Sequence, residues 1–225
     1  MSGKVWISSV LSNYDIGMKQ GSRTKFYGHE WNPASLQIPL SPDEVHEASR
    51  RHRQGFVISR AEFAEAEAVW DEKRFKKIKD IFAVAGPFYA VRGKLAEILS
   101  RSDLGDGGLL PFTIYQADLV TPYPGEFFLL NFGARKNSIL PERSENVVKF
   151  AVDHKTGLQY WKVNSWHEDA EVALSPVALE GPDLWFEEFV DNKIFMSDCL
   201  AQALIDIGMK DIFELKECRI VEGAE

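Results

Sequence analysis

The sequence predicts an α+β fold with mixed, mainly antiparallel sheets and a few packed helices. Three observations predict it: strand patterns separated by turn residues run along most of the chain, few segments show helical spacing, and one strand, helix, strand pattern occurs twice. The chain has 225 residues, of which 45% are hydrophobic, and both values are ordinary for a compact globular protein. We therefore expect one domain, or a domain with a subdomain.

Residues 1–79 are expected to form an N-terminal α/β subdomain. Ser41 and Pro42, followed by two acidic residues, are typical of a helix start. Ser59 and Glu62 have the spacing of a capping box, and the run rich in alanine and glutamate that follows predicts a second helix. The expected elements are strands over residues 4–11 and 24–31 and helices over residues 41–52 and 59–70.

Residues 80–225 are expected to form a second domain with two related halves, and the alternative is a single compact unit over the whole chain. Glycine- and proline-rich turns separate the apolar segments of this part. The expected helices cover residues 95–99 and 198–207, and the expected strands cover residues 110–120, 126–132, 147–152, 158–163, 184–190, 194–196 and 212–221.

An internal repeat is predicted within the second part. The segments Leu95–Leu99 and Leu200–Leu204 both place leucines at positions i and i+4 with an apolar residue at i+3. The apolar residues after each helix also match at one constant offset and break strand alternation at the same place, which predicts a β-bulge in both copies. The aligned residues are Phe112, Ile114, Ala117 and Leu119 in one copy and Phe213, Leu215, Cys218 and Ile220 in the other.

The same region resembles immunity-protein family eleven of bacterial polymorphic toxin systems. The resemblance covers about residues 80–222 and depends on short apolar motifs around the two helices. These motifs are Asp80-Ile81-Phe82, Pro87-Phe88-Tyr89-Ala90-Val91, Leu184-Trp185-Phe186 and Ile194-Phe195-Met196-Ser197. The resemblance implies a cytosolic protein that binds and neutralises a cognate secreted toxin without catalysis, and it supplies no set of binding residues. A small hydrolase or transferase and a regulatory interaction module are the alternatives.

The charge distribution favours a basic protein partner. The net charge is −8, and residues 1–80 carry 13 basic and 11 acidic residues, so the acidic excess lies wholly in the remainder. An acidic surface repels phosphate backbones, so we expect no nucleic-acid binding. The longest apolar runs are far shorter than the roughly 20 residues of a membrane helix, and the first ten residues lack a signal-peptide pattern, so a cytoplasmic protein is expected. The sequence does not fix the oligomeric state.

No residue pattern in the sequence predicts a catalytic, cofactor or metal site. The two cysteines are too few for a four-ligand zinc site, and the turn from Gly105 to Gly108 lacks the lysine and hydroxyl residues of a phosphate-binding loop. Five histidines occur without metal-ligand spacing. They are His29, His46, His52, His154 and His167.

The segment from Trp161 to Asp191 is the candidate for partner contact. It contains eight acidic residues against one lysine, together with three tryptophans. Acidic groups around aromatic anchors suit a basic partner, because charge accelerates encounter and desolvated aromatic rings hold the complex. The alternative places the tryptophans in the core and the acidic residues on a solvated face. The candidate contact residues are Trp166, His167, Glu168, Asp169, Glu171, Asp183, Glu187 and Glu188.

Overall fold

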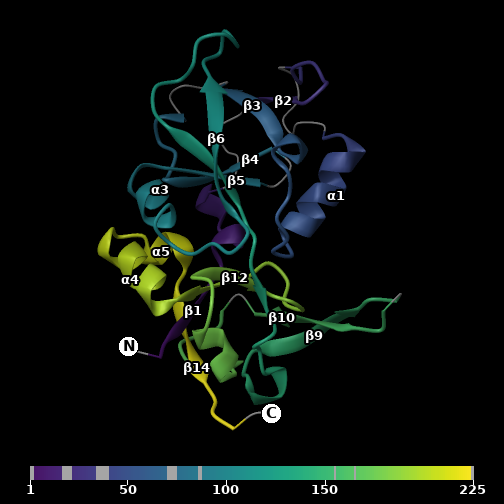
Figure 1. Ribbon diagram of the computed structural model, residues 1–225, viewed down its shortest axis with the longest axis vertical. Coiled ribbons are helices and arrows are strands. Elements are labelled where there is room, and N and C mark those ends of the chain that lie inside the picture. Colours follow the sequence, from purple (N-terminus) through teal and green to yellow (C-terminus); the bar gives the residue numbers. More distant parts are fainter. Residues whose placement is uncertain are drawn as a thin grey trace.

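The computed structural model describes residues 3–16, 22–33, 41–69, 75–85, 88–154, 156–164 and 166–223. The fold is α+β, as the sequence predicts, with two mixed six-stranded sheets and a separate two-stranded hairpin (Figure 1). In spatial order the first sheet contains β2 (Ser22–Phe26), β3 (Ala64–Val69), β6 (Gly108–Tyr115), β7 (Phe127–Asn131), β5 (Phe88–Arg92) and β4 (Ile81–Val84). The second sheet contains β11 (Ala173–Leu174), β14 (Lys216–Ile220), β1 (Val5–Ser8), β13 (Ile194–Ser197), β12 (Leu184–Glu187) and β8 (Arg135–Lys136).

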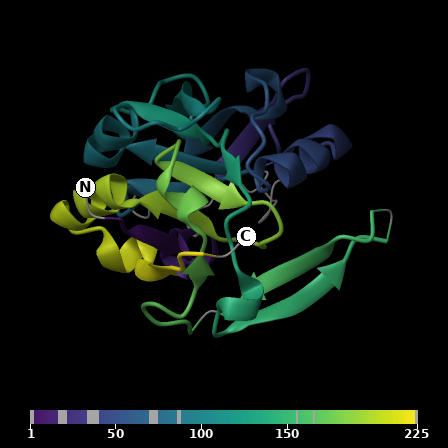
Figure 2. The same ribbon diagram turned by 60° about the horizontal axis from the view of Figure 1, so that its bottom comes forward.

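The helices are short, and the hairpin extends away from the rest of the molecule. The helices are α1 (Asp43–His52), α3 (Gly93–Leu99), α4 (Asp198–Asp206) and α5 (Lys210–Phe213). The hairpin consists of β9 (Val147–Val152) and β10 (Gln159–Val163), and it projects in both views (Figures 1 and 2). In the described ranges, no helix is long and apolar enough to cross a bilayer.

The hydrophobic core lies between the two sheets and continues on their outer faces. Val91 of β5 and Met196 of β13 point into the shared core, together with the leucines of α3 and α4. Their neighbours Ala90 and Phe195 point the other way, into two outer cores. This alternation means that central strands are buried on both faces, as their nearly continuous apolar sequences require.

The helix predicted over residues 41–52 is confirmed as α1, but the helix predicted over residues 59–70 is wrong. The capping interaction exists, since the backbone N–H of Ser59 donates to Glu62 at 2.8 Å, but it closes a single turn only. The following residues form β3, between β2 and β6, and Glu67 is buried there, accepting a bond from the backbone N–H of Ala85 at 2.6 Å. Sheet pairing therefore overrides the helical propensity of alanine and glutamate. Trp70, the expected end of that helix, lies outside the described residues.

The two sheets repeat one topology. In the first, the β4–β5 hairpin leads through α3 to β6, and in the second the β12–β13 hairpin leads through α4 to β14. In each sheet one further strand lies between the second and third strands of the unit and is antiparallel to both. This strand is β7 in the first sheet and β1 in the second. On its other side, the third strand of each unit pairs with a parallel strand: β6 pairs with β3, and β14 pairs with β11. Helices α3 and α4 pack against each other where the halves meet (Figure 1).

The strand alignment predicted for the repeat is wrong, although the repeated unit is present. Phe112 of β6 faces Phe127 of β7, and Cys218 of β14 faces Val5 of β1, so Phe112 corresponds to Cys218. The expected counterpart, Phe213, instead lies in α5, which has no equivalent in the first half.

The β-bulges predicted in the two strands are not observed. The chain leaves β6 after Tyr115, and Leu119 has a left-handed φ of 66° in the turn that follows. The residues of β14 pair with β1 in a continuous register. The shared break in alternation therefore arose from a turn in one copy and a helix end in the other.

The expected boundary after residue 79 does not separate the two sheets. Strand β1 lies in the second sheet, whereas β2 and β3 lie in the first, so the first 79 residues contribute to both. These pairings favour the alternative of a single unit over the whole chain.

Candidate functional site

The loop between β10 and β11 presents Trp166 to solvent. Trp166 is 90% exposed, whereas the next residue, His167, is only 3% exposed. Nδ1 of His167 lies 2.9 Å from the carbonyl oxygen of Asn164, and burial lowers the pKa of the imidazole. His167 therefore anchors the loop from inside, and its prediction as a surface contact residue is corrected.

Three acidic residues follow Trp166 in this loop and differ in their roles. Glu168 is highly exposed and forms an ion pair with Lys216 of β14. Asp169 accepts a hydrogen bond from the backbone N–H of Glu217 at 2.7 Å. Glu171 accepts a bond from the backbone N–H of Glu168 at 2.7 Å, and this bond is the main reason that the pKa of Glu171 is lowered. Asp169 and Glu171 thus fix the loop, and Glu168 is exposed at its surface, paired with Lys216.

Glu187 is buried and structural rather than part of an acidic surface. It is 2% exposed and accepts bonds from the backbone N–H groups of Ser138 and Ile139 at 2.6 and 2.9 Å. The hydroxyl of Ser138 and the indole N–H of Trp185, the latter at 2.9 Å, donate to its other oxygen. A buried carboxylate with this many donors is stable because its charge is fully hydrogen-bonded. Its prediction as a partner-binding residue is therefore corrected.

Asp183 and Glu188 lie on other parts of the fold and also have internal partners. Asp183 accepts a bond from the hydroxyl of Ser197 at 2.5 Å and another from the backbone N–H of Asp103 at 2.9 Å. Glu188 lies 3.6 Å from Arg135. The structure therefore brings together only the Trp166 loop, from Trp166 to Glu171, and not the whole acidic segment.

The three tryptophans of the segment also separate. Trp185 is buried, and the Nζ atom of Lys136 lies 3.4 Å from its ring centroid. Burial is the main cause that lowers the pKa of Lys136 to about 8. Trp161 is half-buried at the base of the hairpin, where its backbone N–H donates to Phe189 at 2.7 Å. The alternative interpretation, in which tryptophans form core, is thus correct for Trp185, while Trp166 fits a contact residue.

A buried lysine and serine lie together in the second half. Lys193 is 4% exposed and Ser9 is 3% exposed, and the lysine donates to the serine hydroxyl. Burial lowers the pKa of Lys193 to about 8. Because a substrate cannot reach atoms at this depth, the pair holds the start of β13 against the end of β1. Over the described ranges, no group of three or more histidine, cysteine or acidic side chains is arranged to hold a metal ion.

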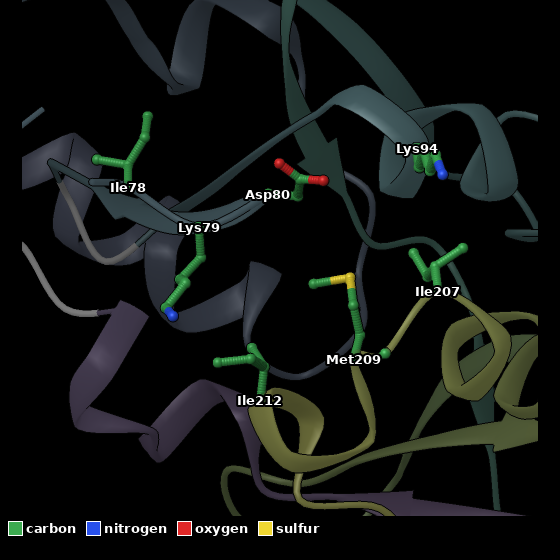
Figure 3. A pocket seen from close by; sticks show the side chains of 8 residues that line it. Ile78, Lys79, Asp80, Lys94, Ile207, Met209 and Ile212 are labelled. Carbon is green, nitrogen blue, oxygen red and sulfur yellow. The ribbon is translucent and has the colours of Figure 1, made fainter. Parts of the chain in front are cut away.

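A surface pocket of about 330 Å³ lies where the two halves meet (Figure 3). Lys79 and Asp80 precede β4, and they face Ile207, Met209 and Ile212 of the α4–α5 region across it. Sequence reasoning missed this pocket, because it arises from a difference between the two copies of the repeat. The sequence feature that could have indicated it is the aspartate that precedes the first strand of each unit, Asp80 in the first and Asp183 in the second.

Sequence reasoning also missed the exposure of the projecting hairpin. Val148, Phe150 and Val152 of β9 are all about half exposed. An apolar strand of this kind resembles one that is buried on both faces, so its pattern gave no sign of exposure.

No protein-family model matches this chain, and no curated protein gives a significant match. The resemblance to the immunity family therefore stays a prediction.

Proposed function

We propose that this chain is an immunity protein that binds and neutralises a cognate secreted bacterial toxin in the cytosol, without catalysis. The observation that carries the proposal is the 90% exposure of Trp166 in a loop with exposed acidic groups. Exposed tryptophans are costly in water and are enriched among the residues that dominate binding energy. The Trp166 loop is therefore the surface that we assign to the toxin.

Charge supports a basic toxin. The chain has a net charge of −8, and Glu168 and Asp169 are both exposed beside Trp166. An acidic rim around an aromatic centre accelerates association with a basic partner and lets burial of the ring slow dissociation. The resemblance of residues 80–222 to the immunity family supports the same partner class.

Co-expression tests the proposal. The product of a toxin gene adjacent to this gene is expressed in a host with and without this chain, and we expect growth only when this chain is present. Failure to protect, or absence of a complex between the two purified proteins, would contradict the proposal.

Substitution of Trp166 tests the assigned surface. Trp166→Ala is expected to weaken toxin binding by about 30-fold, because an anchor of this kind contributes about 2 kcal/mol or more. Val120→Ala is the matched control, since Val120 is 75% exposed in a different turn. Calorimetry with the purified pair measures both variants, and equal affinities would move the interface elsewhere.

Charge reversal tests the electrostatic part. Glu168→Lys is expected to slow association, with a smaller effect at high salt, because screening removes long-range attraction. Glu97→Lys makes the same charge change at an exposed position of α3. Stopped-flow association rates distinguish them, and equal slowing would mean that only total charge matters.

A further inference from the structure

Asp80 and Asp183 are equivalent residues in the two halves. Each precedes the first strand of its hairpin, and the carbonyl oxygen of each accepts a bond from the residue that ends the second strand. Arg92 donates to Asp80 and Ser197 donates to Asp183, both from the backbone N–H at 2.9 Å. The two aspartates therefore occupy the same place in the repeated unit.

The junction at Asp183 is closed by the backbone of one residue, Asp103, from the other half. Its backbone N–H donates to the carbonyl oxygen of Asp103 at 2.7 Å, and its carboxylate accepts from the backbone N–H of Asp103 at 2.9 Å. Asp103 lies four residues after Leu99, the last residue of α3. A short loop after one helix thus satisfies both the donor and the acceptor of the facing aspartate.

The junction at Asp80 is open. The residue that corresponds to Asp103 is Gly208, four residues after Leu204, and there the chain turns with a left-handed φ of 77° into α5. The backbone N–H of Asp80 has no hydrogen-bond partner among the described residues. The pocket occupies this place, with Met209 and Ile212 as its apolar wall (Figure 3). The insertion of α5 therefore leaves unfilled the position that a peptide fills in the other half.

The rim of this pocket is basic, although the protein as a whole is acidic. Lys79 and Lys94 both line the pocket and are exposed, and neither forms an ion pair within the described part of the chain. Asp80 lies 3.4 Å from the guanidinium of Arg92, so its charge is already compensated. The two lysines are consequently available to an incoming carboxylate.

We propose that this pocket binds a short acidic peptide segment of a partner protein. One residue of the segment takes the position that Asp103 has in the closed junction, with its backbone N–H donating to the Asp80 carboxylate and its carbonyl oxygen accepting from the Asp80 N–H. Two carboxylates of the segment lie one at Lys79 and one at Lys94, on opposite sides of Asp80, and an apolar side chain packs on Met209 and Ile212 (Figure 3). This site is distinct from the Trp166 loop, and the proposal does not depend on the function proposed for that loop.

A peptide with the sequence of the closing loop is the probe. Residues 102–107 of this chain, blocked at both ends, carry Asp103 and Asp106 and no basic residue. We expect saturable NMR shifts of the Asp80 amide and of the methyl groups of Met209 and Ile212, with a dissociation constant on the order of 0.1–1 mM. The same peptide with both aspartates replaced by asparagine is expected to bind at least about fivefold more weakly.

Matched lysine variants complete the test. Lys79→Ala combined with Lys94→Ala is expected to weaken binding about five- to tenfold, since each exposed charge pair contributes up to about 1 kcal/mol. Lys149→Ala with Lys162→Ala makes the same charge change on the projecting hairpin and is expected to leave affinity unchanged, as is Trp166→Ala. Absence of saturable shifts at millimolar peptide, or equal affinity for both lysine pairs, would overturn the proposal.

Discussion

The two sheets share one topology but assemble it from different parts of the chain. In the first sheet the central strand β7 follows β6 through a local loop, so apart from β2 and β3 the sheet forms from one continuous stretch of the chain. In the second sheet the equivalent strand is β1, and Val5 pairs with Cys218. The difference teaches that the packing requirements of a sheet fix the position of a strand, whereas the order in which the chain supplies it can change.

The largest effect is expected from substitutions that test whether β1 is as important for stability as β7. Ile7 and Leu129 are equivalent, each facing the second strand of its hairpin, and both have an exposed fraction of 0%. Ile7→Ala and Leu129→Ala are each expected to lower the free energy of unfolding by about 2–5 kcal/mol. Urea denaturation measures both. A decrease in the free energy of unfolding below about 0.5 kcal/mol for Ile7→Ala would show that β1 contributes little to the stability of the second sheet.

A smaller effect is expected at the contact between the two halves. Ala96 of α3 and Ala201 of α4 are buried at equivalent positions, where a larger side chain has no room. Ala96→Leu and Ala201→Leu are each expected to cost about 1–3 kcal/mol of unfolding free energy. The exposed Gln202→Leu is the control in the same helix, and an equal effect there would rule out overpacking as the cause.

A buried histidine of the first half and a buried lysine of the second are expected to make stability depend on pH in two different ranges. His52 is buried among aromatic rings beneath the first sheet, and burial lowers its pKa from 6.5 to about 3. Lys193 lies in the second half, and burial lowers its pKa from 10.5 to about 8. In each range the unfolded chain binds more protons than the folded one, so stability rises with pH. The slope is up to about 1.4 kcal/mol per pH unit for each group.

Two variants separate these ranges. The backbone N–H of Phe132 lies 3.1 Å from Nε2 of His52, and His52→Gln keeps an acceptor there while removing the titration. It is expected to reduce the pH dependence of unfolding between pH 3 and 6.5 only. Lys193→Met is expected to reduce it between pH 8 and 10.5 only, where Lys136 keeps a further contribution. Thermal unfolding across pH measures both, and identical profiles for either variant and the unmodified chain would contradict the assignment.

The smallest effect is expected when the chain order of the second sheet is made to match the first. A circular permutant begins at residue 22 and carries residues 3–16 after residue 223 through a short linker, so that β1 follows β14 as β7 follows β6. Because Val5 faces Cys218, the joined ends lie close together. The permutant is expected to fold with a free energy of unfolding within about 1 kcal/mol of the original chain. Failure to fold would show that the β1–β2 connection itself is required.

The sequence predicted an element correctly where its residue pattern is compatible with only one type of secondary structure. Strands β9 and β10 lie at the expected residues, and α1 begins close to its expected acidic start. Strand β3 could not be found in this way, because its alanines and glutamates favour a helix until two partner strands are present.

At the candidate site the sequence could name the segment but not the orientation of each side chain. Trp166 lies among polar residues and Trp185 lies in an apolar run, a difference that agrees with the exposure of the first and the burial of the second but was not used to separate them. Glu187 could have been placed correctly, since it continues the apolar run of Leu184-Trp185-Phe186, which indicates a strand covered on both faces.

The pairing of β1 with β14 has a consequence for synthesis of the protein. The two strands are about as far apart in the chain as its length allows, and a ribosome adds roughly 5–20 residues per second, so β1 waits roughly 10–40 s for its partner. Its other neighbour, β13, is complete only at Ser197, so for most of that time neither neighbouring strand is available to pair with Val5 and Ile7. A chain that stops before Lys216 never completes this sheet, so proteolysis is expected to remove unfinished copies while leaving finished ones intact.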